Sequence, residues 1–82
     1  MKTEDELYWW LSFADDVTGQ NLGVVMTTAP DFDAALSKTN HLSINPGGEV
    51  RAWEMDGTHE MITDDLLNRL IQKPELKRLN FI

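Results

Sequence analysis

Residues 7–13 read Leu-Tyr-Trp-Trp-Leu-Ser-Phe, and this stretch decides the fold of the chain. Its length and aromatic content predict a β-strand, in which successive side chains point to opposite faces of a sheet. The alternation separates two sets: Leu7, Trp9, Leu11 and Phe13 on one face, and Tyr8, Trp10 and Ser12 on the other. Both faces of the strand are therefore apolar, and each needs a covering element.

The following residues predict a hairpin partner for this strand. Residues 15–21 (Asp-Asp-Val-Thr-Gly-Gln-Asn) are turn formers with a glycine available for positive φ. Residues 22–28 (Leu-Gly-Val-Val-Met-Thr-Thr) are rich in β-branched side chains, which favours a second strand. Because the connection is short, we expect the two strands to be antiparallel.

A helix and a third strand complete the predicted core. Residues 30–36 read Pro-Asp-Phe-Asp-Ala-Ala-Leu, so proline and acids occupy a first helical turn and the apolar positions repeat at helical spacing. Residues 45–48 (Asn-Pro-Gly-Gly) predict a turn into a strand at 49–55, which a second turn at 56–57 closes. The order β-β-α-β indicates an α+β fold with one helix packed on the sheet.

The C-terminal part predicts further helix. Thr63 is a candidate N-cap, and it precedes an amphipathic stripe made of Leu66, Leu67, Leu70 and Ile71. Pro74 starts a last short turn or helix. We therefore expect a single domain over residues 1–82, with a ββαβ core over 1–57 and a helical tail over 58–82. The second sheet face must meet this tail, another copy of the chain, or a partner.

Composition narrows the classes of protein. The 82 residues include 14 acidic and 7 basic side chains, no cysteine, and a net charge of −7. This charge disfavours direct nucleic-acid binding, and no apolar run is long enough for a membrane span. The absence of cysteine and the acidic, non-apolar N-terminus predict a cytoplasmic protein. Because so short a chain builds a small core, we expect it to form a homo-oligomer.

No catalytic constellation is recognisable. His41 and His59 are 18 positions apart by number and lack the spacing of a zinc site, and adjacent aspartates such as Asp15 and Asp16 stand where turns and helix starts favour aspartate. No serine has the context of an activated nucleophile. The sequence therefore predicts a protein that is not an enzyme and has no metal site or cofactor.

One candidate ligand site remains. Two adjacent glycines expose backbone N–H groups that can line an anion-binding nest, and a nearby cation and an exposed indole would suit a nucleotide-like ligand. The residues of this site would be Asn45, Gly47, Gly48, Arg51, Trp53 and Trp10. The simpler interpretation is that the glycines only let the chain turn and that the tryptophans belong to the core.

Three segments resemble a set of small uncharacterised bacterial and phage proteins: residues 10–13 (Trp-Leu-Ser-Phe), 22–25 (Leu-Gly-Val-Val) and 44–50 (Ile-Asn-Pro-Gly-Gly-Glu-Val). Residues 68–70 (Asn-Arg-Leu) resemble the tail of that family. His41-Leu42-Ser43 stands where the usual pattern has Leu-Gly, so the helix end departs from it. The resemblance covers most of the chain and implies a coherent fold and a phage or mobile-element setting, without an activity.

These observations leave three functions open. The first is a non-enzymatic interaction module that self-associates, or binds a host protein, through its second sheet face or through Leu66, Leu67, Leu70 and Ile71. The second is a binder of a small anionic, nucleotide-like ligand. The third is an acidic mimic of nucleic acid that inhibits a basic protein.

Overall fold

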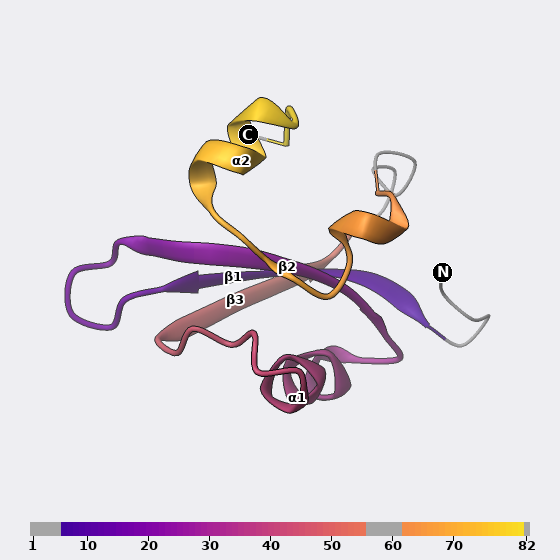
Figure 1. Cartoon of the computed structure of the whole chain (residues 1–82). Coiled ribbons are helices and arrows are strands. Elements are labelled where there is room, and N and C mark those ends of the chain that lie inside the picture. Colours follow the sequence, from indigo (N-terminus) through magenta and orange to yellow (C-terminus); the bar gives the residue numbers. More distant parts are fainter. Residues whose placement is uncertain (1–5, 56–61, 82) are drawn as a thin grey trace.

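The computed structural model describes residues 6–55 and 62–81, which form a four-stranded sheet with a helix on either side (Figure 1). The elements are β1 (Leu7–Ala14), β2 (Asn21–Ala29), α1 (Phe32–His41), β3 (Glu49–Glu54), the 3₁₀ turn η2 (Asp64–Leu66), β4 (Leu70–Ile71) and α2 (Lys73–Arg78). The sheet order is β3-β1-β2-β4, with every neighbouring pair antiparallel. The predicted α+β class is confirmed. The predicted turn at 56–57 and His59 lie outside the described residues.

The hairpin of β1 and β2 forms as the turn residues predict. In the loop, the Asp15 carboxylate accepts hydrogen bonds from the backbone N–H groups of Val17 and Thr18, at 2.8 and 2.9 Å. These bonds favour the charged carboxylate and lower the pKa of Asp15. The pairing shifts at a bulge between Phe13 and Ala14, and β2 begins opposite that point.

Helix α1 covers the first face of the sheet. Its N-cap is Asp31, whose side chain accepts the Ala34 N–H at 2.8 Å. Ala35 of the helix packs on a core cluster of buried sheet side chains: Leu11, Phe13, Val25 and Ala29. At the other side of the helix, Lys38 Nζ donates to the Thr28 carbonyl oxygen at 2.7 Å. The helix closes this face over β1 and β2, whereas Val50 and Ala52 on β3 are half-buried.

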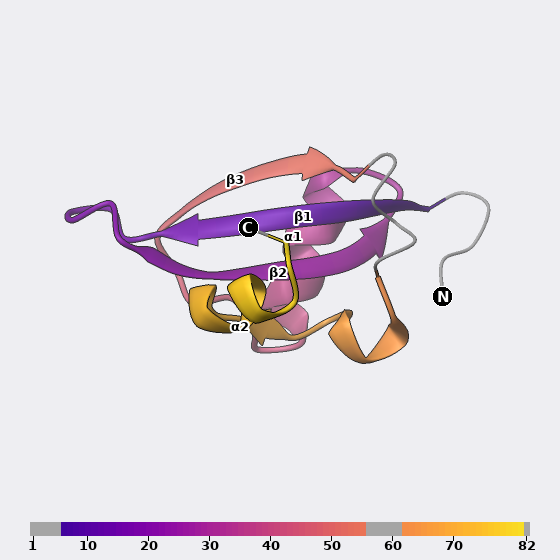
Figure 2. The same ribbon diagram turned by 90° about the horizontal axis from the view of Figure 1, so that it is seen from above.

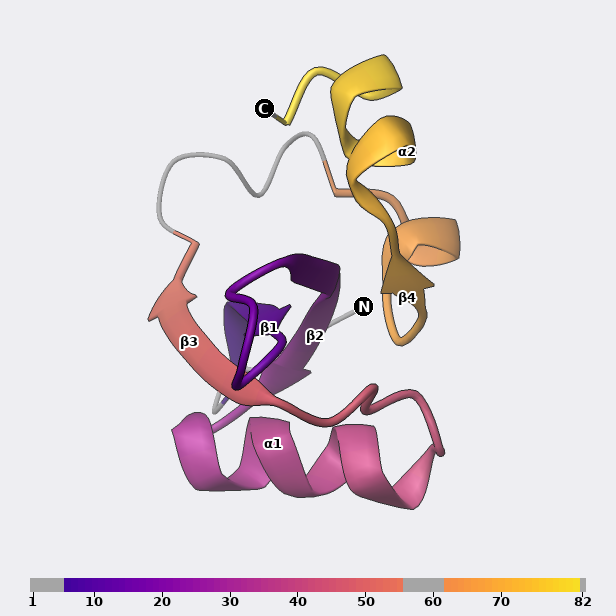
Figure 3. The same cartoon turned by 90° about the vertical axis from the view of Figure 1, so that its left-hand side faces the viewer.

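The C-terminal segment packs on the second face, opposite α1 (Figure 3). Its core cluster consists of Trp10, Val24, Met26, Met55, Leu66, Ile71 and Leu76. The segment is not the amphipathic helix that the leucine spacing predicts. Residues 64–66 make one 3₁₀ turn, and β4 then adds to the outer edge of β2. That prediction is wrong over 63–72, whereas the short helix at Pro74 exists as α2.

Asn68 explains why residues 63–72 do not continue as a helix. Its backbone is left-handed, with φ +61°, a conformation that asparagine tolerates better than most residues. The Asn68 N–H donates to the Met26 carbonyl at 2.8 Å, and its side-chain oxygen accepts the Thr27 hydroxyl at 2.6 Å. These bonds join the segment to β2, so its apolar residues are divided between the two faces of the sheet instead of lying along one helical stripe.

A guanidinium group holds the tail together. Arg69 binds the Glu75 carboxylate through two hydrogen bonds of 3.2 and 2.7 Å, and its Nε donates to the Asp65 carbonyl at 3.0 Å. This geometry is bidentate, which makes it stronger than a single-point ion pair. The contact links η2 to α2. None of the helices described in this structure is long and apolar enough to cross a membrane.

Candidate functional site

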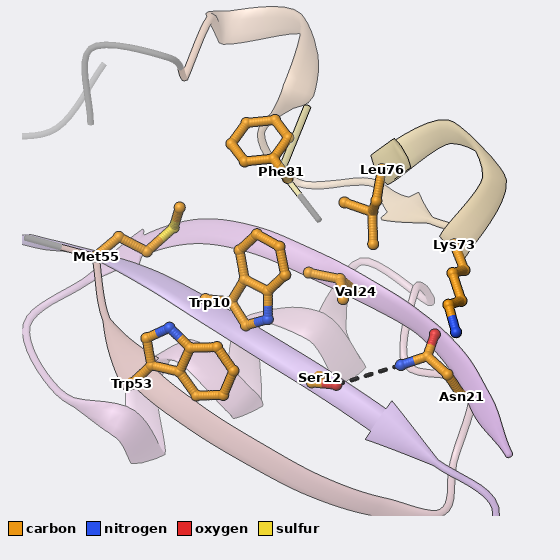
Figure 4. A pocket seen from close by; sticks show the side chains of 9 residues that line it. All are labelled: Trp10, Ser12, Asn21, Val24, Trp53, Met55, Lys73, Leu76 and Phe81. Atoms are coloured by element: carbon orange, nitrogen blue, oxygen red, sulfur yellow. Dashed lines mark hydrogen bonds between the residues drawn. The ribbon is translucent and has the colours of Figure 1, made fainter. Parts of the chain in front are cut away.

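A cleft lies between α2 and the β3 side of the sheet. Seen from above, α2 follows the β2 side while β3 lies at the opposite edge (Figure 2). The uncovered part of the second face is a hollow of about 400 Å³ (Figure 4). Its lining residues are Trp10, Ser12, Asn21, Val24, Trp53, Met55, Lys73, Leu76 and Phe81. A volume of this order is typical of sites for small ligands.

Two tryptophans form the floor of the cleft. The register of β1 and β3 sets Trp10 directly opposite Trp53, so both indoles emerge on the second face. Their ring centroids are 5.8 Å apart and their planes differ by 16°, a stacked arrangement. Trp10 is 8% exposed and Trp53 is 52% exposed. The floor therefore offers a flat indole surface. The buried Trp10 ring anchors it, and the Trp53 ring is open to solvent.

The wall opposite β3 comes from the tail. The Phe81 ring lies 5.9 Å from Trp10, tilted by 55°. Leu76, on α2, is 2% exposed and faces the same space. After α2 the chain reverses at Asn80, with φ +67°, and the Phe81 N–H donates to the Leu76 carbonyl at 3.0 Å. This reversal returns the phenyl ring over the sheet.

The other end of the cleft is polar. Asn21 Nδ2 donates to Ser12 Oγ at 3.3 Å, and the Lys73 side chain extends toward the same end (Figure 4). Within residues 6–55 and 62–81, no carboxylate lies within ion-pair distance of the Lys73 ammonium. The cleft therefore combines an apolar, aromatic end with a polar end that carries one uncompensated positive charge.

Two neighbouring cations are engaged elsewhere. Glu75 binds Arg69 at 2.7 Å and also lies 3.8 Å from Arg78. The hydrogen bond and charge of Arg69, with a smaller effect of Arg78, lower the pKa of Glu75. Lys73 lies on the same short helix and lines the cleft, so its positive charge acts there. In a chain of net charge −7, any attraction of the cleft for an anion would be local to this lysine.

The structure brings together only part of the predicted ligand site. Trp10 and Trp53 meet, as described. Arg51 is on the same strand and face as Trp53, opposite Ser12, but its side chain is 81% exposed and does not line the cleft. Its Nε lies 3.7 Å from Glu49 Oε1. Arg51 is thus available at the sheet edge beside the cleft.

Asn45, Gly47 and Gly48 form a turn rather than a wall of the cleft. Asn45 Oδ1 accepts the Gly47 N–H at 2.7 Å, and Asn45 Nδ2 donates to the Thr39 hydroxyl at 3.4 Å. Gly48 has φ +78°, and a side chain there would overlap the Ala14 carbonyl. The backbone needs glycine at Gly48 for close approach to β1, which agrees with the simpler interpretation of the sequence.

The four predicted interface residues contribute to packing within the chain. Leu66 is 5% exposed and Ile71 is fully buried, both in the second-face core. Leu67 is half-buried against that core and bridges to Met26. Leu70 is half-buried on the first face, where its side chain lies against Gly23. An interface through these residues would compete with the packing contacts that they already make within the chain.

Sequence reasoning missed most of the cleft lining. Ser12 carried a usable signal, because it alternates in phase with Trp10. No local pattern marked the other residues. Asn21 reaches the cleft because of a bulge, Lys73 because of a short helix, and Phe81 because of a chain reversal.

The comparisons with known proteins assign no family. No protein-family model matches the chain, and no curated protein and no solved structure shows significant similarity to it. The resemblance to phage and bacterial proteins stays a prediction. Among the described residues, no group of three or more histidine, aspartate or glutamate side chains is arranged to hold a metal ion.

Proposed function

We propose that the chain is a non-catalytic binding protein whose cleft accepts a planar aromatic group carrying a negative charge. One observation carries the proposal. The stacked indoles of Trp10 and Trp53 floor a hollow of about 400 Å³ that has Lys73 at its polar end. Aromatic floors with a few placed polar groups are typical of sites for small ligands.

The chemistry of the lining defines the ligand. A flat ring can stack on the exposed indole of Trp53, as nucleobases do on aromatic side chains. An acidic group on the same ligand would face the Lys73 ammonium, and a neighbouring hydroxyl or carbonyl could bond to Asn21. A nucleotide-like anion satisfies all three requirements. Arg51 and the turn at Gly47 and Gly48 are not needed for this placement.

The test is a comparison of charged and neutral aromatic ligands. Nucleoside monophosphates and the corresponding nucleosides would be titrated against the protein while the three indole N–H resonances are followed by NMR. We expect the Trp10 and Trp53 signals to move and the Trp9 signal to stay, because the Trp9 indole donates to the Ala29 carbonyl at 3.1 Å and belongs to the first-face core.

Two variants make the test specific. Trp53→Ala should abolish the shifts for both ligand types. Lys73→Gln should weaken only the charged ligand, whereas Lys77→Gln, an exposed neighbour outside the cleft lining, should change neither. Shifts that survive Trp53→Ala, or a panel in which no ligand moves the Trp10 and Trp53 signals, would contradict the proposal.

The second candidate function is a protein-interaction module, with an origin in a phage or mobile element. The observation that favours it is the 52% exposure of Trp53 on an edge strand. Half-exposed tryptophans are frequent anchors of protein interfaces. In that case the occupant of the cleft would be an aromatic or acidic side chain of a protein, and free nucleotides would not displace it.

A further inference from the structure

The outer edge of β3 is the longest unpaired edge of the sheet. Strand order places β3 at one end and β4 at the other, and β4 is only two residues long. Within the described residues, no strand pairs with the side of β3 that faces away from β1. A six-residue edge of this kind is a template for another strand.

The backbone groups at this edge can be identified. The Met55 N–H donates to the Tyr8 carbonyl of β1 at 2.9 Å. Because hydrogen-bonding directions alternate along a strand, Trp53 and Arg51 also direct their backbone groups toward β1. The N–H and C=O groups of the intervening residues, Val50, Ala52 and Glu54, point to the open edge.

We propose that β3 pairs with β3 of a second copy, antiparallel and centred on Ala52, so that the partner's Arg51 covers Trp53. In this register Ala52 lies opposite Ala52, and Val50 opposite the partner's Glu54. All three edge-facing residues are then hydrogen-bonded in both copies. Two four-stranded sheets become one continuous sheet with a twofold axis, a closed arrangement that adds no further copies.

A cation–π contact selects this register. Arg51 and Trp53 become directly opposite on the second face, at a non-hydrogen-bonded position where side chains approach most closely. A guanidinium over an indole face is a favourable cation–π pair, and the symmetry forms it twice. Arg51 is accessible for this role, because its side chain is 81% exposed and, among the described residues, it pairs with the exposed Glu49 carboxylate at 3.7 Å.

The neighbouring registers are less favourable. Centring on Arg51 would set two guanidinium groups opposite one another, and like charges at such positions are destabilising. Centring on Trp53 would pair the indoles but leave each Arg51 opposite Met55. Arg51 therefore disfavours the first of these registers by repulsion, and in the second it lacks the cation–π partner that the Ala52-centred register provides.

The dimer would also change the candidate ligand site. Both clefts would open on the same face of the joined sheet. In each of them the partner's Arg51 would cover the exposed indole of Trp53, so a ligand that stacks on this ring would compete with the guanidinium group. The strand pairing itself does not require a ligand, since the backbone edge exists whether or not the cleft is filled.

The absence of cysteine from the chain permits a clean test of the register. The mass of the unmodified protein would be measured by light scattering over a range of concentrations, with the dimer expected at twice 9.4 kDa. Ala52→Cys should then cross-link rapidly under mild oxidation, because the two Cα atoms would be about 5.5 Å apart. Glu54→Cys, on the same edge, should not, since its copies would be separated along the strand.

A charge variant tests the cation–π contact in a chain that keeps the backbone edge. Arg51→Glu should weaken dimerisation by about tenfold or more, whereas Lys77→Glu makes the same change in net charge away from β3 and should not. A protein that stays monomeric at every concentration would overturn the proposal. Equal cross-linking of Glu54→Cys and Ala52→Cys, or a dimer indifferent to Arg51→Glu, would do so as well.

Discussion

The two faces of the sheet are built by the same strands but are covered in different ways. On the first face, Leu11, Phe13 and Val25 are 0–1% exposed beneath the ten-residue helix α1. On the second face, Val24 is just as buried, but Trp53 is 52% exposed. The cover of the second face is a 3₁₀ turn and a six-residue helix, which are joined by the two-residue strand β4 at the sheet edge.

The difference shows how an irregular cover produces a site. A continuous helix presents one apolar stripe and closes a face along its length. The tail is anchored to β2 through Asn68 and β4, so it shields the β2 side and leaves the β3 side open. We infer that the first face mainly stabilises the fold, and that the second face combines stability with the cleft.

The largest expected effect is on the closed face. Phe13→Ala removes a ring that is 1% exposed, and such truncations cost about 3–5 kcal/mol. Since a small domain has only about 5–15 kcal/mol of stability, this variant should be close to unfolding. Urea denaturation followed by circular dichroism measures the change.

The control for this variant is Val17→Ala, which removes an apolar side chain that is 92% exposed at the hairpin tip. Its free energy of unfolding should change by less than about 0.5 kcal/mol. A similar cost for both variants would mean that the first face is not the stabilising core.

The next-largest effect is expected in α2, and it tests whether the tail unfolds separately from the sheet. Leu76→Ala truncates a buried side chain of α2 and should cost about 2–4 kcal/mol. Because so short a helix depends on packing, α2 amides should lose hydrogen-exchange protection while the β1–β2 amides keep theirs. The matched control is Lys77→Ala, which truncates an exposed neighbour of Leu76. Uniform loss of protection would show that tail and sheet unfold as one unit.

The sequence predicted the closed face well, for a physical reason. Strand alternation at 7–13 separates the two sets of side chains without reference to the rest of the chain. Asp31 and the apolar spacing after it are local signals for α1, and the structure has both features. Short-range periodicity is sufficient wherever a regular element packs on a regular surface.

The open face could not be predicted in this way. The spacing of Leu66, Leu67, Leu70 and Ile71 suits a helix, yet the hydrogen bonds of Asn68 to β2 override that preference. Those bonds are made to residues about 40 positions earlier, and no local pattern contains them. The position of the tail determines the cleft, so the contribution of Lys73 and Phe81 to its lining could not be predicted either.

A smaller effect on stability is expected inside the cleft. Trp53→Ala removes a half-exposed indole and its stacking on Trp10, which should cost only about 1 kcal/mol. The same variant should abolish binding of planar ligands. Urea denaturation and ligand titration on one sample measure both. A loss of stability as large as that of Phe13→Ala would make Trp53 a core residue and remove the contrast between the faces.

The smallest effect is the pH dependence of the tail. Arg69 lowers the pKa of Glu75 below its ordinary value of 4.5, so the folded state favours the charged carboxylate. The stabilisation is therefore complete above 4.5, and it is lost as the pH falls through the lower folded-state pKa. We expect α2 amide signals to move in that acidic range. Glu75→Gln should remove this transition, whereas Asp15→Asn, which eliminates another lowered pKa in the hairpin loop, should leave it intact. If the α2 signals titrate identically in Glu75→Gln, the Arg69–Glu75 contact is not the source of the transition, and α2 is held by the packing of Leu76 and by the anchoring of Asn68 and β4 to β2.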